Sequence, residues 1–265
     1  MTDGGPAAWR VLRDPPTPGA RNMAVDEALA RHVEAGEGVL RLYRWSAPTV
    51  SFGRNQVALG RYSADAARHR GVDLVRRPTG GRAVWHQEEL TYSVVAPLRS
   101  FGGIREAYAA IHRGIVAGLR SLGVQADVAQ DTGPVPGPAA EGTCFIGPAP
   151  GEVVVGHRKV VGSAQVRVRR ALLQHGSILL EGRQGRLRSL TLDDAPPGED
   201  ADTSATLSEF LAGPPPVEDV VEAVSAGLRD TLGGDWRAGG LTPAEESTAA
   251  GLVERYASSE WTWRR

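Results

Sequence analysis

The 265-residue sequence predicts an α+β fold, in which a mixed β-sheet is flanked by helices. Three observations lead to this fold class. Strand-like and helical segments are interleaved along the chain. Several strand-like segments follow one another closely enough to form hairpins, which a purely parallel sheet does not allow. Hydrophobic residues make up 41% of the chain, which is enough for a sizeable core. We find no internal repeats.

Helices are predicted from apolar residues at helical spacing and from signals at the helix ends. Residues 22–36 form such a segment, and its acidic residues are expected in the first turn. Residues 63–71 begin with Ser63 as an N-cap and end at a glycine, so they predict a short helix. The most regular helical pattern covers residues 104–123. Two more helices are predicted near the C-terminus, over residues 216–233 and 242–258.

Strands are predicted where apolar and polar residues alternate, or where short apolar runs end in turn residues. In chain order these segments are residues 39–45, 49–53, 72–77, 83–86 and 90–98. Residues 153–180 predict a further series of strands, with turns near Gly156 and near Arg169 and Arg170. The chain therefore supplies enough strands for a sheet that spans the whole domain.

Residues 130–152 are too rich in glycine and proline for regular structure. Long irregular loops inside compact domains are often functional, and this one carries Cys144. Residues 199–205 predict a second loop or linker. We expect residues 1–213 to form the main domain, with residues 214–265 as a helical extension that packs on it.

The composition excludes several broad classes of protein. A net charge of −1 speaks against a nucleic-acid binder or a protein of anionic membrane surfaces. No apolar run of about 18 residues is present to cross a membrane, and the N-terminus shows no signal core. We expect a cytoplasmic monomer. The single cysteine excludes an intrachain disulfide and argues against a structural zinc cluster, so no metal site is expected.

The 30 basic residues comprise 29 arginines and one lysine, Lys159. A lysine that persists in such a chain could perform a task that arginine cannot, because its ammonium is a compact point charge that can also titrate. The alternative is that Lys159 is a surface residue that has remained a lysine by chance. On a strand, alternation would place Lys159, Val161 and Ser163 on one side, and Gly162 would leave room for a ligand. The candidate binding residues in this part of the chain are Gly162, Ser163, Ala164, His175 and Gly176.

The stretch "RRPTGGRAVWH" at residues 76–86 gathers three arginines around a glycine-rich turn. The glycines allow backbone amides to approach a ligand, and guanidinium groups suit phosphate oxygens. Taken alone, the stretch could equally be an ordinary turn with a structural or exposed histidine. The candidate binding residues are Arg76, Arg77, Thr79, Gly80, Gly81, Arg82 and His86.

Six segments together resemble the lipoate and biotin cofactor-transferase superfamily, which includes lipoate-protein ligase A and the octanoyltransferases of lipoate synthesis. They are "NMAVDEAL", "RRPTGGRAVWHQEELTYSV", "CFIGP", "RKVVGSAQVR", "LLQHGSILL" and "LVERYASSEW". They occur in family order over most of the chain. The resemblance is greatest to the cysteine-dependent octanoyl-[acyl-carrier-protein]:protein N-octanoyltransferases. It implies a catalytic domain like that of biotin and lipoate protein ligases, with residues 1–213 as the acyltransferase domain.

The resemblance also implies roles for two residues. Cys144 would carry the acyl group as a thioester, and Lys159 would lower the pKa of its thiol. The implied donor is octanoyl-acyl carrier protein. The implied acceptors are the lipoyl domains of 2-oxoacid dehydrogenases and the H protein of glycine cleavage. No cofactor is expected.

Three alternatives remain open at this point. An ATP-dependent lipoate ligase would need ATP and Mg²⁺, but ligases tend to have a third glycine where this chain has Arg82. An amidotransferase would move octanoyl between two lipoyl-bearing proteins, also through a cysteine. A protein that has kept the fold but lost the activity would only bind carrier domains.

Overall fold

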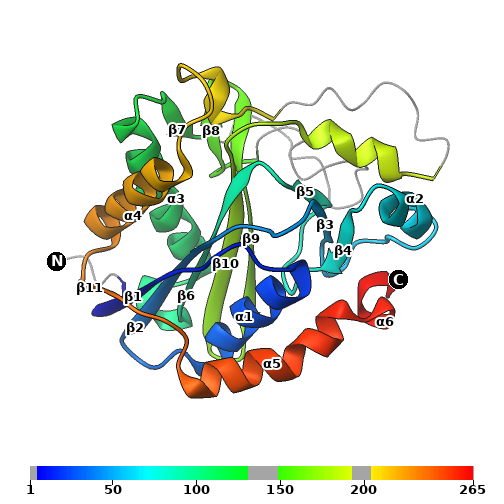
Figure 1. Cartoon of the computed structure of the whole chain (residues 1–265). Helices are drawn as coiled ribbons and strands as arrows, with labels where there is room; N and C mark the ends of the chain where they lie inside the picture. The colour runs from blue at the N-terminus through cyan, green and yellow to red at the C-terminus, as the bar shows by residue number, and fades with distance from the viewer. Residues whose placement is uncertain (1–4, 131–148, 193–203, 265) are drawn as a thin grey trace.

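The computed structural model describes residues 5–130, 149–192 and 204–264. A mixed eight-stranded sheet forms the centre of the molecule. Helices α1 and α5 lie along one side of it and helices α3 and α4 along the other (Figure 1). A three-stranded sheet stands beside it together with α2. This arrangement confirms the α+β fold with a mixed sheet and flanking helices.

The strands are β1 (Ala8–Arg13), β2 (Glu37–Tyr43), β3 (Thr49–Phe52), β4 (Asp73–Arg76), β5 (Val84–His86), β6 (Glu89–Pro97), β7 (Ala126–Val128), β8 (Val153–Val155), β9 (Arg158–Val168), β10 (Ala171–Leu179) and β11 (Asp235–Ala238). The α-helices are α1 (Gly19–His32), α2 (Ala64–His69), α3 (Ile104–Ser121), α4 (Val217–Leu232), α5 (Pro243–Ala257) and α6 (Ser259–Trp263). Short 3₁₀ helices are η1 (Leu98–Phe101), η2 (Gln184–Leu190) and η3 (Leu207–Glu209).

The large sheet has the strand order β11-β1-β2-β6-β10-β9-β8-β7, and the small sheet has the order β4-β3-β5. In the large sheet β1 runs parallel to both of its neighbours, while the remaining pairs are antiparallel. The antiparallel part contains the predicted hairpin between β9 and β10. Its turn includes Arg169, which has a positive φ of 54°. β10 pairs with β6 on one side and β9 on the other, so it lies inside the sheet.

The two faces of β6 show why the core divides. Leu90, Tyr92 and Val94 belong to the largest hydrophobic cluster, which also takes in residues of α3 and α4. On the other face, Ser93 donates a hydrogen bond to Asp26 of α1. Alternation along β6 thus directs Tyr92 to the larger apolar core and Ser93 to polar partners under α1, while Val95 joins a second apolar cluster with residues of α1.

Several predicted boundaries are confirmed. Ser63 caps α2 by accepting a hydrogen bond from the backbone N–H of Ala66 at 3.0 Å. α3 covers most of the predicted 104–123 segment. α4 and α5 agree with the two predicted C-terminal helices to within a residue at each end.

One expectation about α1 was wrong. The helix begins at Gly19, three residues before the predicted start, and it has no acidic residue in its first turn. Asp26 and Glu27 therefore lie in the middle of the helix, where both are buried. Glu27 accepts a hydrogen bond from Tyr256 of α5, which fastens the two helices together. The prediction failed because Pro18, which precedes the helix, is not a side-chain cap.

Three short strands were not predicted: β1, β7 and β11. β11 comes from the segment 214–265, which was expected to be helical, and it pairs in parallel with β1 at the edge of the large sheet. No helix in the described ranges is long and apolar enough to cross a membrane. Cys144 and residues 199–203 of the predicted loop 199–205 lie outside the described residues.

Candidate active site

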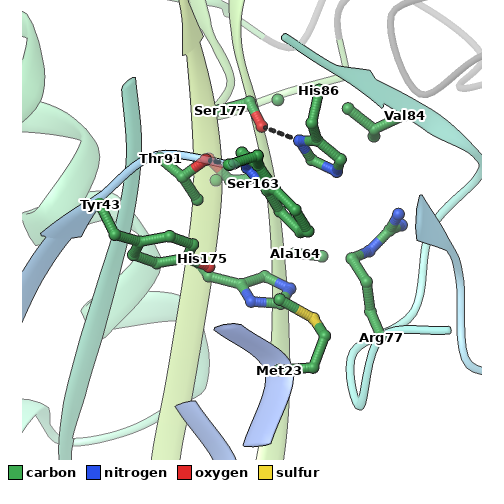
Figure 2. Close-up of a pocket in the computed structure, with 13 residues that line it drawn as sticks. Met23, Tyr43, Arg77, Val84, His86, Thr91, Ser163, Ala164, His175 and Ser177 are labelled. Atoms are coloured by element: carbon green, nitrogen blue, oxygen red, sulfur yellow. Dashed lines mark hydrogen bonds between the residues drawn. The ribbon is translucent and has the colours of Figure 1, made fainter. Parts of the chain in front are cut away.

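A narrow pocket opens beside β9 and β10 (Figure 2). Seven of the predicted binding residues line it: Arg77, His86, Gly162, Ser163, Ala164, His175 and Gly176. The other lining residues are Met23, Tyr43, Trp45, Val84, Thr91 and Ser177. The sequence segments that were predicted to form a site therefore do meet in space.

Two glycines on neighbouring strands, Gly162 and Gly176, line the pocket, and packing requires a glycine at position 176. In the β9–β10 ladder Gly162 is opposite Ser177, and Gly176 is opposite Ser163. A Cβ atom on Gly176 would lie 2.6 Å from the carbonyl oxygen of Gly162 and 2.7 Å from Ser163 Oγ. The first of these is a backbone atom, so the strands would have to move apart. A side chain at position 176 is therefore excluded by packing.

Arg77 clamps the glycine-rich turn rather than leaving its donors for a ligand. One guanidinium nitrogen donates to the backbone oxygens of Gly80, at 3.0 Å, and Arg82, at 2.8 Å. The other donates to the backbone oxygen of Ser51 at 2.6 Å. Gly81 has a positive φ of 90°, which favours glycine. The arginine thus fixes the shape of the turn at the edge of the pocket.

Arg76 points away from the pocket. Its guanidinium donates to the backbone oxygens of Gly53, at 2.6 Å, and Gln56, at 2.8 Å. It also reaches Thr262 of α6 at 2.9 Å. Neither Arg76 nor the turn residues Thr79, Gly80, Gly81 and Arg82 line the pocket. The three arginines of the motif therefore do not converge on one ligand position.

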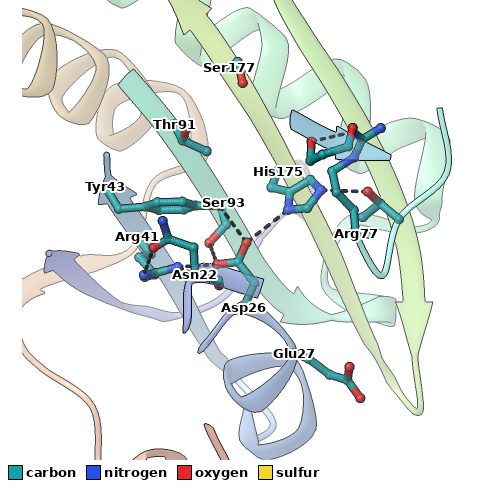
Figure 3. A network of polar contacts seen from close by, with 12 residues as sticks. Asn22, Asp26, Glu27, Arg41, Tyr43, Arg77, Thr91, Ser93, His175 and Ser177 are labelled. Atoms are coloured by element: carbon teal, nitrogen blue, oxygen red, sulfur yellow. Dashed lines mark hydrogen bonds and ion pairs between the residues drawn. The ribbon is translucent and has the colours of Figure 1, made fainter. Parts of the chain in front are cut away.

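Asp26 is the centre of a buried polar network under the pocket (Figure 3). Its carboxylate accepts hydrogen bonds from Arg41, at 2.8 Å, and Ser93, at 2.9 Å. Tyr43, at 2.9 Å, and His175, at 3.0 Å, donate to its other oxygen. Every one of these side chains is fully or almost fully buried. The network holds Tyr43 and His175 in the pocket wall.

The charges in this network follow from its geometry. Burial alone would raise the pKa of Asp26, but hydrogen bonding by His175 and the charge of Arg41 lower it. Burial lowers the pKa of His175, against the effect of Asp26. His175 is then neutral at physiological pH, with the proton on Nδ1 facing Asp26. Its Nε2 accepts a hydrogen bond from Thr79 at 2.6 Å, which ties the glycine-rich turn to β10.

His86 and Glu89 form a second polar group at the pocket. Glu89 Oε1 accepts from His86 Nδ1 at 2.7 Å, from Thr91 at 2.6 Å and from Ser177 at 2.8 Å. Trp45 stacks on the His86 ring, with a centroid separation of 4.0 Å. His86 was predicted to be either a ligand contact or a structural residue. The structure gives it both a place in the pocket lining and a fixed hydrogen-bond partner.

Lys159 is buried near the start of β9 and pairs with Glu152. Its Nζ lies 2.5 Å from Glu152 Oε1, and the lysine is only 2% exposed. This burial argues against chance survival on the surface. Lys159 is not among the residues that line the pocket.

The expectation that Lys159 and Ser163 share one side assumed a regular strand, which β9 is not at this point. The register between β8 and β9 shifts at this point, because Val153 pairs with Val161 while Val154 pairs with Lys159. Val160 and Val161 both pack in the same core cluster, so alternation is broken between them. A bulge of this kind re-aims side chains, so regular alternation does not decide on which side of β9 Lys159 lies.

Sequence reasoning missed four residues that organise the site: Asp26, Glu89, His112 and Glu152. His112 could have been noticed in the sequence, because it occupies a core-facing position of the amphipathic helix α3. A histidine there needs polar partners. Asp26 and Glu89 stand in segments that carry the family resemblance, but their buried roles were not recognised because their partners come from other parts of the chain. Glu152 gave no comparable signal. In the described ranges no group of three or more potential ligands could hold a metal ion.

This chain is similar to known proteins both in sequence and in fold. Residues 18–229 match the model of the lipoyl protein ligase A/B catalytic domain. The octanoyltransferase LipM of Symbiobacterium thermophilum is 40% identical over 97% of this chain and 98% of its own length. The LipM of Kyrpidia tusciae is 38% identical, over 97% and 99%.

Two solved structures have the same fold over nearly the whole chain. A lipoate-protein ligase A bound with ATP superimposes with a TM-score of 0.80 at 25% identity, covering 97% of this chain and 98% of its own. A bipartite lipoate protein ligase from Thermoplasma acidophilum, described with its E2 lipoyl domain, gives a TM-score of 0.77 at 26% identity, covering 98% and 96%. With the pocket, the glycine-rich turn and the match of sequence in agreement, the chain belongs to the lipoyl protein ligase A/B catalytic-domain family.

Proposed function

We propose that this protein transfers an octanoyl group from octanoyl-acyl carrier protein to a lysine of a lipoyl domain, through a thioester on Cys144. The observation that carries the proposal is the similarity, over 97% of the chain, to relatives named octanoyltransferase. The pocket supports it, because Met23, Tyr43, Trp45 and Val84 give the lining an apolar part suited to a short aliphatic chain.

The proposed reaction has two steps. In the first, the Cys144 thiolate attacks the thioester carbonyl carbon. The bond from that carbon to the carrier sulfur breaks, and the carrier thiolate leaves and takes up a proton. In the second, the neutral amine of the acceptor lysine attacks the acyl-enzyme. The amide bond forms, the bond to Cys144 Sγ breaks, and the amine gives up one proton. A thioester drives amide formation, so the proposal needs no ATP.

Lys159 is proposed to stabilise the Cys144 thiolate by its positive charge. A unit charge about 4 Å away is worth up to about 4 kcal/mol at an effective dielectric of 20. The Glu152 carboxylate beside the ammonium weakens that field at any third group. The role therefore requires the thiolate to approach the ammonium on the side away from Glu152.

The proposal extends to partners. The acceptors are the lipoyl domains of 2-oxoacid dehydrogenases and the H protein of glycine cleavage. In support, one structural relative is a ligase described with its E2 lipoyl domain. We propose that the enzyme acts as a cytoplasmic monomer without cofactor or metal.

The test is to incubate the enzyme with octanoyl-acyl carrier protein, without acceptor, and to measure its intact mass. We expect one octanoyl group, mapped to Cys144, and none on Cys144→Ala. Adding an apo lipoyl domain should then release the group as an amide. An acyl group elsewhere in the chain, or normal turnover by Cys144→Ala, would contradict the proposal.

The alternatives are separate outcomes of the same assay. Transfer of free lipoate that requires ATP and survives Cys144→Ala would assign the protein as a ligase, consistent with its likeness to an ATP-bound ligase. Acylation of Cys144 by an octanoylated lipoyl-bearing protein, but not by the acyl carrier protein, would assign it as an amidotransferase. Binding of carrier domains without any transfer would mean an inactive fold.

A further inference from the structure

The chain is pinned together on either side of residues 131–148. The backbone N–H of Ala129 donates to the carbonyl oxygen of Glu152 at 2.7 Å, and the N–H of Gly151 donates to the oxygen of Ala129 at 2.8 Å. We call Ala129 and residues 149–152 the stem. These bonds continue the pairing of β7 with β8, in which Val128 pairs with Val153, so the stem extends one end of the large sheet. Side-chain hydrogen bonds attach the stem to β9 and α3 as well.

Glu152 provides one such attachment. Its Oε1 contacts Lys159 Nζ at 2.5 Å, and its Oε2 accepts a hydrogen bond from the backbone N–H of Ala149 at 2.8 Å. Both oxygens of one carboxylate are therefore used, one within the stem and one on β9. A charge-assisted bond of this length in a buried setting is strong and directional.

His112 of α3 provides the second attachment, at the neighbouring stem residue. Its Nδ1 lies 2.5 Å from the carbonyl oxygen of Gly151, and its Nε2 lies 2.8 Å from Ser163 Oγ. The ring is fully buried, and Tyr108 packs against it with a centroid separation of 4.0 Å. His112 thus joins the stem to β9 at one of the residues that line the pocket.

The donor and the acceptor of each hydrogen bond around His112 can be assigned. The oxygen of Gly151 can only accept, so Nδ1 carries the proton. Burial, together with the charge on Lys159, lowers the pKa of His112 to about 4, so the ring is neutral and Nε2 accepts from Ser163. Ser163 in turn accepts from Tyr92, whose pKa burial raises to about 12. Gln174 donates to the Tyr92 oxygen at 2.9 Å, which completes a satisfied network.

We propose that His112 is a positioning residue for the reaction: it holds the stem at Gly151 against β9 at Ser163, so that the chain rejoins the fold in one orientation beside Lys159. The β7–β8 pairing and the contact of Glu152 with Lys159 hold the stem at the large sheet. The contact of His112 with Gly151 joins the neighbouring stem residue to α3 and to Ser163 as well. This inference rests on the proposed function, because Cys144 belongs to the segment that the stem closes.

Two variants separate the roles of the two ring nitrogens. In His112→Asn the amide takes roughly the place of Nδ1 and can still donate to Gly151. In His112→Gln the amide takes roughly the place of Nε2 and can still bond to Ser163, but the stem contact is lost. If the stem contact matters, His112→Gln should slow acylation of Cys144 by octanoyl-acyl carrier protein about tenfold. His112→Asn should slow it about threefold or less.

A second readout distinguishes positioning from a general loss of structure. Cys144 is the only cysteine, so alkylation reports on one thiol. In His112→Gln the pH midpoint of alkylation should move upward, because a misplaced thiolate is less well stabilised by the ammonium of Lys159. In His112→Asn it should stay near the wild-type value. His32→Gln, at an exposed histidine of α1, is the matched control and should change neither the midpoint nor the rate.

The outcomes separate the two hypotheses. If wild-type enzyme is acylated on Cys144 and His112→Gln matches it in both rate and midpoint, then His112 does not position the stem, while the proposed function stands. The same conclusion follows if Asn and Gln reduce the rate equally and neither moves the midpoint. If the wild-type enzyme forms no acyl group on Cys144, the proposed function itself has failed.

Discussion

His112 should make the free energy of unfolding depend on pH between about 7 and 4. In the folded protein burial lowers the pKa of its ring to about 4, from a usual value of 6.5. The unfolded chain therefore binds a proton in this range that the folded chain rejects. Because the unfolded state gains protons as the pH falls, stability is complete above pH 6.5 and is lost as the pH decreases toward 4.

The magnitude follows from the two pKa values. Linkage gives a loss of about 2 kcal/mol at pH 5 and about 3 kcal/mol at pH 4, relative to pH 7. For a domain whose total stability is about 5–15 kcal/mol, this is a large fraction. Burial lowers the pKa of His175 as well, so its contribution has the same sign. A comparison with a variant is therefore needed to isolate His112.

The assay is urea denaturation of the wild type and His112→Asn at several pH values between 7 and 4. Contributions from His175 and from the carboxylates are common to both proteins and cancel in the difference. We expect the variant to lose about 3 kcal/mol less than the wild type over this range. A difference that does not vary with pH, or an NMR titration of the His112 ring with a midpoint near 6.5, would refute the assignment of a neutral, doubly hydrogen-bonded imidazole.

Three further predictions concern packing and charge. Gly176→Ala should lower the free energy of unfolding by about 1–3 kcal/mol, because its Cβ would press on the backbone of β9. Gly80→Ala is the control, since there is open space around its Cβ, and equal urea midpoints for the two variants would contradict the packing argument. Lys159→Arg should reduce kcat/KM for octanoyl transfer at least tenfold, equivalent to about 1.4 kcal/mol. The reason is that a bulkier planar cation must fit a buried position 2.5 Å from Glu152. Turnover near that of the wild type would show that only the charge matters. Gly251→Ala, at an exposed position inside α5 with nothing near its Cβ, should stabilise the protein by about 0.5–1 kcal/mol, and an unchanged or lower thermal midpoint would count against this.

The elements that sequence reasoning predicted well are those with local causes. α3 has a regular apolar stripe, α2 has a serine cap, and polar and apolar residues alternate over the first six residues of β6. β1, β7 and β11 are short, and each is a strand because a neighbour supplies its hydrogen bonds. Patterns within a few residues cannot report such pairing. The start of α1 was misplaced for a related reason, since proline replaces the usual polar cap.

The candidate site shows the same difference between residues fixed by local motifs and residues whose roles depend on distant partners. Gly162, Gly176 and His175 were identified because short motifs fix them, and they do meet in one pocket. Gly80 and Gly81 belong to a motif as well, but they do not line it. The arginines were harder, because a long side chain can reach in many directions and tertiary packing selects one. Arg76 and Arg77 are adjacent in sequence, yet one turns toward α6 and the other toward the glycine-rich turn. The roles of Glu152 and Asp26 depend on partners that only the fold brings within reach.

The tether between Arg76 and α6 makes the last residues of the chain part of the pocket's support. Arg76 donates to the backbone oxygen of Thr262, and the indole N–H of Trp261 donates back to the oxygen of Arg76 at 3.0 Å. The next residue, Arg77, clamps the glycine-rich turn. An exopeptidase that trimmed the C-terminus as far as Trp261 would therefore loosen a loop some 180 residues earlier in sequence. We expect limited digestion from that end to reduce octanoyl transfer while the fold persists, so a purification tag is better placed at the N-terminus.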